Sequence, residues 1–143
     1  MSIRIGFLKR SHIHLLFNNE NMKREMKKLG LSNQQRLRHR EEFSSVYAQR
    51  TRSGDQNLLI YAKPNDLGVT RIGLSVSRKH GNAVVRGKLK RWIREAFRLL
   101  QHELPEGLDL IIIPLNAEKA SFKNYFKSLK KLVNKLSKRF QES

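Results

Sequence analysis

The part of this sequence best suited to binding chemistry is residues 81–101, GNAVVRGKLKRWIREAFRLLQ, which combine an apolar and a cationic pattern. At about 100° per residue, the segment predicts one amphipathic helix with two adjoining faces. The apolar face is expected to hold Val85, Leu89, Trp92, Ile93, Ala96 and Leu100. The cationic stripe is expected to hold Arg86, Lys90, Arg91, Arg94 and Arg98. Like charges at this spacing repel each other, so the stripe favours an anionic ligand that offsets the repulsion.

The composition of the stripe favours nucleic acid over a solvated helix face. Glu95 is the one acid between Gly81 and Gln101, whereas a solvated face usually mixes both signs. The segment has four arginines and two lysines, and a guanidinium group can bind two phosphate oxygens at once. A solvated basic face is the alternative, and these features make it the weaker one.

The whole chain has the same charge bias. Its 143 residues suit one domain with a modest core, and 30 Lys and Arg against 12 Asp and Glu give a formal net charge of +18. Such a charge attracts polyanions, with nucleic acid the leading partner and an anionic membrane surface the second. The sequence has no cysteine, which excludes disulfides and thiolate metal sites. It has neither a bilayer-spanning apolar run nor a secretory signal pattern, so we expect no membrane association and a cytoplasmic location.

The periodicity elsewhere predicts one α/β domain at residues 32–143, after a mobile N-terminal extension at residues 1–31. Helices are expected at Arg40–Arg50, Gly81–Gln101 and Ser121–Phe140, and strands at Leu58–Ala62, Val69–Ser77 and Leu108–Pro114, with a short edge strand within Thr51–Gln56. A strand, a helix and a second buried strand in series predict a βαβ unit with parallel pairing. The last helix is apolar on one side and rich in lysine on the other. It is expected to cover the sheet, with a membrane-surface helix as the alternative.

Two patterns on the predicted elements leave alternatives open. Phe43, Val46 and Tyr47 recur at helical spacing, which predicts a core position for Val46 and leaves Phe43 and Tyr47 open between the core and the surface. The strand at residues 69–77 alternates between an apolar face and a face that is small at Gly73 and Ser75. Small residues there allow close approach of a ligand or backbone, and tight packing against a helix explains them equally well.

Catalytic patterns of protein nucleases are missing from the sequence. The carboxylates are scattered, and the five histidines show no metal-ligand spacing, so neither a two-metal site nor an acid–base pair is indicated. His80 is expected to be an exposed loop residue, since no acid is placed to orient it. In the same loop, Lys79 lies close before Asn82, a candidate N-cap, and this arrangement suits phosphate. A catalytic site that is assembled only when the chain folds is the remaining alternative.

Residues 71–98, RIGLSVSRKHGNAVVRGKLKRWIREAFR, resemble the signature of the bacterial ribonuclease P protein subunit. The positions similar to the arginine-rich helix of that family are Arg86, Lys88, Lys90, Arg91, Arg94, Glu95 and Phe97. The match is long and includes the strand before the helix, which makes it specific. The match departs at Gly87, where the family usually has Asn. This chain therefore lacks a side-chain amide at position 87 and any contact that the amide would make.

The resemblance implies a two-layer α/β sandwich with element order αβββαβα and a four-stranded sheet. The fold would be of the ribosomal-protein second-domain type, with a left-handed crossover, although the general rule favours the right hand. It also implies an endoribonuclease that removes the 5′ leader of precursor tRNA, in which an RNA subunit carries the chemistry and binds most of the Mg²⁺. The implied partners are that catalytic RNA and precursor tRNA, with the protein monomeric within the complex. A ribosomal or general RNA-binding protein is the alternative, and a self-sufficient nuclease is a further one.

The resemblance further implies two RNA-binding surfaces. The catalytic RNA would contact Arg86, Lys88, Lys90, Arg91, Arg94 and Arg98. The single-stranded leader would lie in a groove formed by Phe43, Tyr47, Tyr61, Ser75 and Lys79. A base stacked on an aromatic ring there contributes about 1–3 kcal/mol without requiring a particular base. Since only the precursor has a leader, the groove would distinguish it from mature tRNA.

Overall fold

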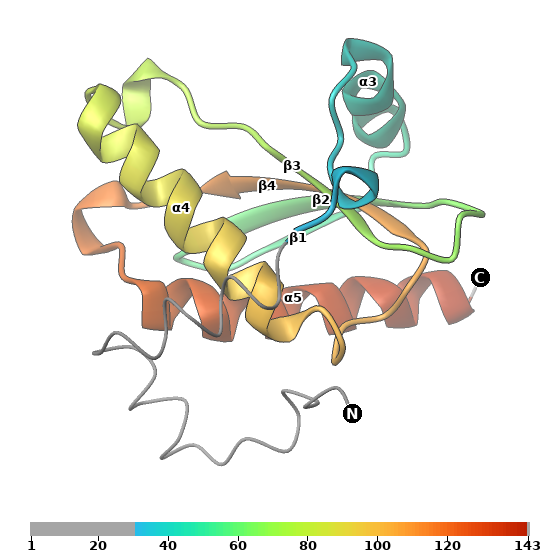
Figure 1. Ribbon diagram of the computed structural model, residues 1–143. Helices are drawn as coiled ribbons and strands as arrows, with labels where there is room; N and C mark the ends of the chain where they lie inside the picture. Colours follow the sequence, from blue (N-terminus) through green and yellow to red (C-terminus); the bar gives the residue numbers. More distant parts are fainter. Residues whose placement is uncertain (1–30, 143) are drawn as a thin grey trace.

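The computed structural model describes residues 31–142, so the expected extension at residues 1–31 lies outside the described residues except for Leu31. Within that range the elements follow the expected order αβββαβα (Figure 1). The helices are α3 (Arg40–Ala48), α4 (Ala83–Leu100) and α5 (Phe122–Glu142). The strands are β1 (Arg52–Gly54), β2 (Leu58–Pro64), β3 (Arg71–Leu74) and β4 (Leu108–Pro114). Three short 3₁₀ turns in the described range are η2 (Asn33–Gln35), η3 (Arg78–His80) and η4 (Ala117–Lys119).

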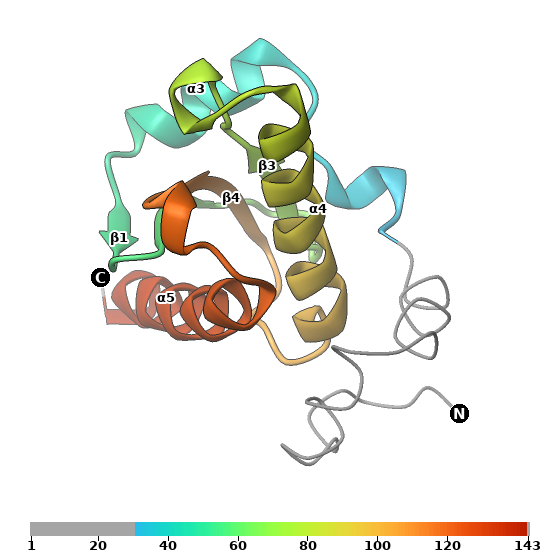
Figure 2. The ribbon, with the colours of Figure 1, turned by 90° about the vertical axis from the view of Figure 1, so that its left-hand side faces the viewer.

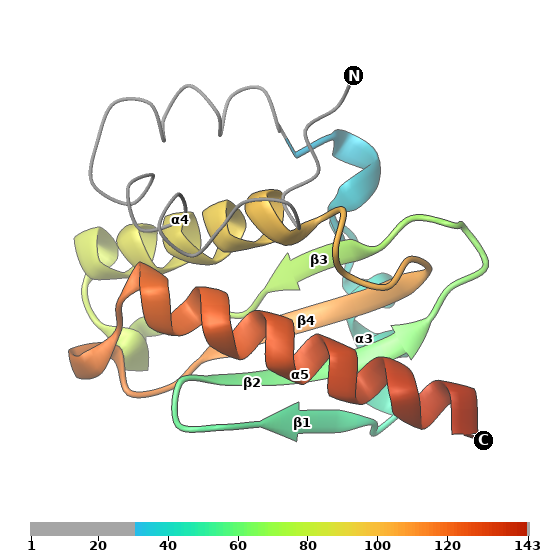
Figure 3. The same cartoon turned by 90° about the horizontal axis from the view of Figure 1, so that it is seen from below.

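The strands form one mixed four-stranded sheet in the order β1-β2-β4-β3. The inner strand β4 is antiparallel to β2 along residues 58–64 and parallel to β3 along residues 71–74. Helix α4 connects the two parallel strands, which confirms the predicted βαβ unit. Figure 3 shows α4 and α5 in front of the sheet, and in this view the β3–α4–β4 crossover is left-handed, as the resemblance implied.

The main core lies between the sheet and helices α4 and α5. Of the positions expected on the apolar face of α4, Val85 and Trp92 are only partly buried, and the others are fully buried. Phe97 and Leu99 are also buried, so the buried face is wider than the predicted one. The reason is that α4 packs on the sheet and also along α5 (Figure 2).

Helix α3 lies on the opposite face of the sheet from α4 and α5 (Figures 1 and 2). Its Val46 is fully buried in a small cluster with Leu37 and Ile111, which confirms the prediction for Val46. Phe43 and Tyr61 pack against this cluster while remaining partly exposed. The two-layer sandwich is thus confirmed for the main core, and α3 adds a partial layer on the other side.

Strand β3 is shorter than the predicted strand at residues 69–77. Its pairing with β4 ends at Leu74, with one further hydrogen bond from the Ser75 N–H to the Ile112 carbonyl (3.1 Å). Val76 is partly buried without belonging to the strand. The apolar alternation therefore continues past the last strand residue, because the chain stays against the core while it turns toward η3.

Candidate RNA interface

Helix α4 starts at the cap that the sequence predicted. The Asn82 Oδ1 accepts a hydrogen bond from the Val85 N–H, and the Asn82 carbonyl accepts one from the Arg86 N–H, both at 2.9 Å. This cap fixes the first turn and with it the direction of every later side chain on α4. Gly87 lies on the exposed side, and a Cβ placed there would have no atom within 4 Å.

The cations of α4 fall into two groups by exposure. Arg91 is 64% exposed, and its Nε lies 3.9 Å from the Glu95 Oε1. Lys88 is also exposed, and its Nζ lies 4.7 Å from the centroid of the Trp92 ring. The remaining cations are partly buried, and these are Arg86, Lys90, Arg94 and Arg98.

Arg36 joins the partly buried group from a different part of the chain. It follows η2, where a parallel bridge to Ile72 holds the backbone beside β3. A hydrogen bond between the side chains of Gln35 and Gln101 (3.0 Å) ties the same segment to the end of α4. Sequence reasoning missed Arg36, because the segment around it has no helical or strand period.

The guanidinium groups of this region repel one another. Burial lowers the pKa of Arg94, and the neighbouring charges of Arg36 and Arg98 lower it further. The Nε atoms of Arg36, Arg86 and Arg98 are buried, and no hydrogen-bond partner occupies them among the residues that the structure describes. A buried donor without a partner is unfavourable. An anion placed against these groups would relieve both the repulsion and the missing hydrogen bonds.

The predicted aromatic residues form a second surface, on the α3 side of the sheet. The rings of Tyr47 and Tyr61 meet edge to face, with centroids 4.9 Å apart and planes inclined by 72°. Arg52 donates from Nη1 to the Tyr61 hydroxyl at 3.1 Å, and its guanidinium carbon lies 5.9 Å from the centroid of that ring. Tyr47 is 36% exposed, so of its two possible positions the core is not the one adopted, and its ring is accessible for stacking.

Phe43 accounts for the small residue at Gly73. A Cβ added to Gly73 would lie 2.5 Å from the Phe43 Cζ, so the ring packs directly on the backbone of β3. Of the two explanations for Gly73, tight packing against a helix is therefore the one realised. Phe43 is still partly exposed, which leaves part of its ring at the surface.

Ser75 and Lys79 lie beyond the carboxyl end of β3. Ser75 is partly buried, and Lys79 is exposed on η3. His80 is partly buried, so the prediction of an exposed loop residue is wrong: its Nδ1 accepts from the Ser77 N–H (2.9 Å), and its Nε2 then donates to the Pro114 carbonyl (2.8 Å). His80 thereby ties η3, with Lys79, to the end of β4.

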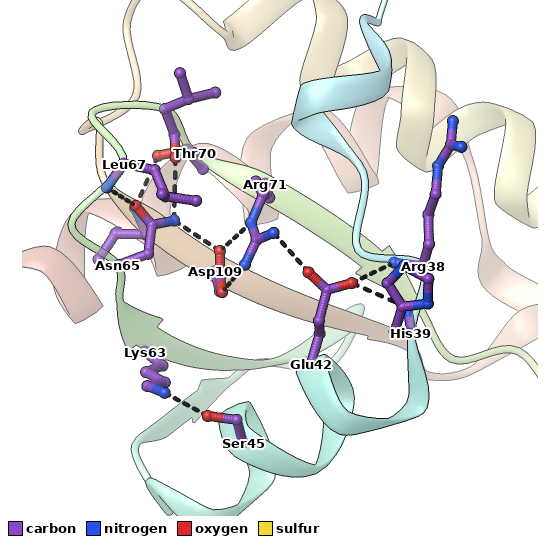
Figure 4. A network of polar contacts seen from close by, with 12 residues as sticks. Arg38, His39, Glu42, Ser45, Lys63, Asn65, Leu67, Thr70, Arg71 and Asp109 are labelled. Carbon is purple, nitrogen blue, oxygen red and sulfur yellow. Dashed lines mark hydrogen bonds and ion pairs between the residues drawn. The ribbon is translucent and has the colours of Figure 1, made fainter.

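A polar network that was not predicted from the sequence joins α3 to the sheet (Figure 4). Arg71 donates to both carboxylate oxygens of Asp109, at 2.8 and 2.7 Å, and to the Glu42 Oε2 at 2.6 Å. The Glu42 Oε1 accepts from the backbone N–H groups of His39 and Arg38, and these bonds together with Arg71 hold the pKa of Glu42 below its usual value. Two acids that are far apart in sequence thus meet at one guanidinium.

The described residues give no sign of a metal site or a membrane span. Residues 31–142 hold no group of three or more His, Asp or Glu side chains that could bind a metal ion. No helix of that range is long and apolar enough to cross a bilayer.

Comparison with known proteins gives a consistent result. A sequence model of the family described as Ribonuclease P matches residues 31–137. The ribonuclease P protein component of Photobacterium profundum is 40% identical over 114 residues, which cover 79% of this chain and 97% of that protein. The solved structure of the RNase P protein from Thermotoga maritima has a TM-score of 0.65 at 30% identity and covers 70% and 96% of the two chains. A structure of the Staphylococcus aureus RNase P protein has a TM-score of 0.64 at 30% identity and covers 73% and 95%.

Proposed function

Because this chain belongs to the bacterial ribonuclease P protein family and is the protein subunit of the ribonucleoprotein that processes the 5′ end of precursor tRNA, we propose that it divides its two RNA partners between two faces. The cationic face of α4 binds the catalytic RNA, and the aromatic surface beside α3 binds the leader of precursor tRNA. The observation that carries this proposal is the set of partly buried guanidiniums on and beside α4 for which residues 31–142 supply no anionic partner.

On the first face, the cations would neutralise phosphates of the catalytic RNA. The proposed contacts are Arg86, Lys88, Lys90, Arg91, Arg94 and Arg98. Each phosphate contact releases counterions, so binding should weaken steeply with salt. Less repulsion within the RNA would let its Mg²⁺ sites fill at lower ion concentration. The donor set of the described residues does not suit Mg²⁺ on the protein itself, and we assign the ion chiefly to the RNA.

On the second face, the leader would pass over the accessible rings of the aromatic surface. The proposed contacts are Phe43, Tyr47, Tyr61, Ser75 and Lys79. The accessible edge of Tyr47 and the Arg52 contact to Tyr61 support stacking of bases beside a cation that can reach a phosphate. Lys79, held in place through His80, would offer a second cation beyond the carboxyl end of β3.

Cleavage of precursor tRNA at low Mg²⁺ tests the division of labour. The protein alone, the cognate catalytic RNA alone and the two together are compared. We expect efficient cleavage only by the pair, since the chemistry belongs to the RNA. Cleavage by the protein alone would contradict the proposal.

The leader surface is tested separately by Tyr47→Ala. We expect affinity for precursor tRNA to fall by about 1–3 kcal/mol because one stacking ring is removed, while affinity for mature tRNA is unchanged. Lys135→Ala, at an exposed position on α5, is the matched control. Equal losses for precursor and mature tRNA would remove Tyr47 from the leader site.

A further inference from the structure

A cavity of about 160 Å³ lies between α4, the outer edge of β3 and the chain segment before α3. Its apolar wall is formed by Leu37, Ile72 and Leu74. Its cationic wall is formed by Arg36, Lys90 and Arg94. A wall of each kind in one small space is the arrangement that fits a ligand with an apolar body and an anionic end.

The cationic wall has unused capacity for an anion. The Arg36 Nε is buried and has no hydrogen-bond partner in the described part of the chain, and the same holds for the Nε of Arg98, whose charge acts on Arg94. Glu95 is the residue after Arg94 on α4, and its carboxylate is paired with the exposed Arg91. Phosphate oxygens are the acceptors that guanidinium forks match best.

The apolar wall also includes backbone groups of β3 that can form hydrogen bonds with a ligand. β3 is an edge strand, and its only described partner on the outer side is the bridge to Arg36, through the hydrogen bond from the Leu37 N–H to the Ile72 carbonyl. The Ser75 N–H points the other way, toward the Ile112 carbonyl of β4. Since these directions alternate along a strand, the backbone groups of Leu74 face outward, on the side of the cavity.

We propose that this cavity binds one unpaired ribonucleotide, with its base against Leu37, Ile72 and Leu74 and its phosphate on Arg36 and Arg94. Pockets for drug-sized ligands occupy about 300–1,000 Å³, so this cavity suits one base and excludes a larger cofactor. The choice of a ribonucleotide rests on the proposed function, in which α4 follows the catalytic RNA. An extruded nucleotide of that RNA would anchor the strand that α4 contacts.

The test uses the full-length protein, with Leu and Ile methyl groups labelled for NMR, titrated separately with 5′-AMP, adenosine and inorganic phosphate. We expect 5′-AMP to shift the methyl signals of Ile72 and Leu74 in a saturable manner, while those of Leu129, a fully buried core residue of α5, stay in place. Adenosine should bind at least about tenfold more weakly, since it lacks the charged hydrogen bonds. Phosphate should leave the methyl signals unshifted. If phosphate shifts them with the same affinity as 5′-AMP, or if 5′-AMP shifts none, the proposal is overturned.

Variants then locate the ligand. Arg36→Ala should weaken 5′-AMP binding about tenfold, as expected for loss of one charged contact. Lys90→Ala, in a helix that alanine favours, provides a second variant if Arg36→Ala disturbs the methyl spectrum of the core. Lys135→Ala is the control and should bind 5′-AMP normally. Unchanged binding by both cavity variants would place the nucleotide elsewhere.

These readouts separate the cavity from the function of α4 as a whole. The titration contains no catalytic RNA, so it can fail while α4 still binds that RNA. Conversely, Arg91→Ala lies outside the cavity lining and reports on catalytic-RNA binding alone. Suppose that Arg91→Ala weakens binding of the catalytic RNA while 5′-AMP does not bind the cavity. This result would contradict the nucleotide site and would still support the proposed function.

Discussion

Arg71 and Arg94 are the same residue type in opposite electrostatic surroundings. Arg71 binds Asp109 through two nitrogens and Glu42 through a third, and the hydrogen bonds to Asp109 are the main cause of its raised pKa. Arg94 is partly buried beside Arg36 and Arg98, and burial with these like charges lowers its pKa. The first arginine has its anions within the protein. For the second, no anion is found among the residues that the structure describes.

This difference separates structural from binding arginines in a chain with a charge of +18. Partial burial of a cation is unfavourable unless an anion compensates it. The chain has enough acids to compensate a few of its cations, and it places two of them on Arg71, where α3 meets the sheet. Among the described residues, the partly buried guanidiniums of Arg36, Arg86, Arg94 and Arg98 have no such acid, and in the proposed function the catalytic RNA supplies the anion.

The largest expected effect is loss of stability in Arg71→Ala. The variant leaves Asp109, whose side chain is 8% exposed, without its cation, and we expect the free energy of unfolding to fall by about 3 kcal/mol. Denaturant unfolding measures it. In a double-mutant cycle with Asp109→Ala, the two losses should be clearly less than additive. Additive losses would mean that Arg71 and Asp109 are not energetically coupled, and the difference drawn between Arg71 and Arg94 would then be wrong.

The next effect concerns binding, in Arg94→Gln. Removing one of several repelling guanidiniums while keeping the alkyl stem should change the free energy of unfolding by less than about 0.5 kcal/mol. Affinity for the catalytic RNA should fall about tenfold, and the slope of log K against log salt should flatten by about one. Binding isotherms at several salt concentrations test both, with Lys135→Ala as control. An unchanged slope would take Arg94 out of the interface.

A smaller effect of about 1 kcal/mol is expected for Glu42→Gln at pH 7, because the charged hydrogen bonds to Arg71 and to the start of α3 are weakened. The folded-state pKa of Glu42 lies below its usual value, so the carboxylate stabilises the fold above pH 4.5. This contribution is lost as the pH falls through the folded-state pKa. Unfolding curves of wild type and variant should therefore converge in acid, with the exposed Asp66→Asn as control. A difference that persists in acid would assign the effect to packing.

The sequence predicted those parts of the fold that depend on local patterns. Asn82 caps α4 as expected, because an N-cap needs only a suitable side chain three residues before the N–H it accepts from. The strand at Leu108–Pro114 matches its prediction residue for residue, because a run of large apolar side chains suits one buried position in the sheet. The hand of the crossover came from the family resemblance, since the general rule predicts the opposite.

The missed residues depend on contacts between distant segments. Glu42 and Asp109 lie 29 and 38 residues from Arg71, and no local pattern joins them. A signal for Asp109 was still present, because an acid between two apolar residues of a buried strand needs a cation nearby. Arg36 gave no such signal, since its position beside α4 follows from the bridge to Ile72. The assignment of the α4 and aromatic residues to particular RNAs stays a prediction.

The smallest expected effect on stability is at Gly87, where a substitution tests whether RNA binds the exposed side of α4. A Cβ there would have no atom within 4 Å outside the backbone of its own helix, so Gly87→Asn should raise the free energy of unfolding by only about 0.3 kcal/mol through helix propensity. A larger effect of this substitution is expected only in the affinity for RNA. If α4 binds the catalytic RNA along this side, the new amide should increase affinity for that RNA, whereas Gly87→Ala should raise the free energy of unfolding by about 1 kcal/mol without increasing that affinity. Equal affinities for the two variants would show that RNA does not reach position 87, and the interface would then centre on the partly buried cations from Lys90 to Arg98.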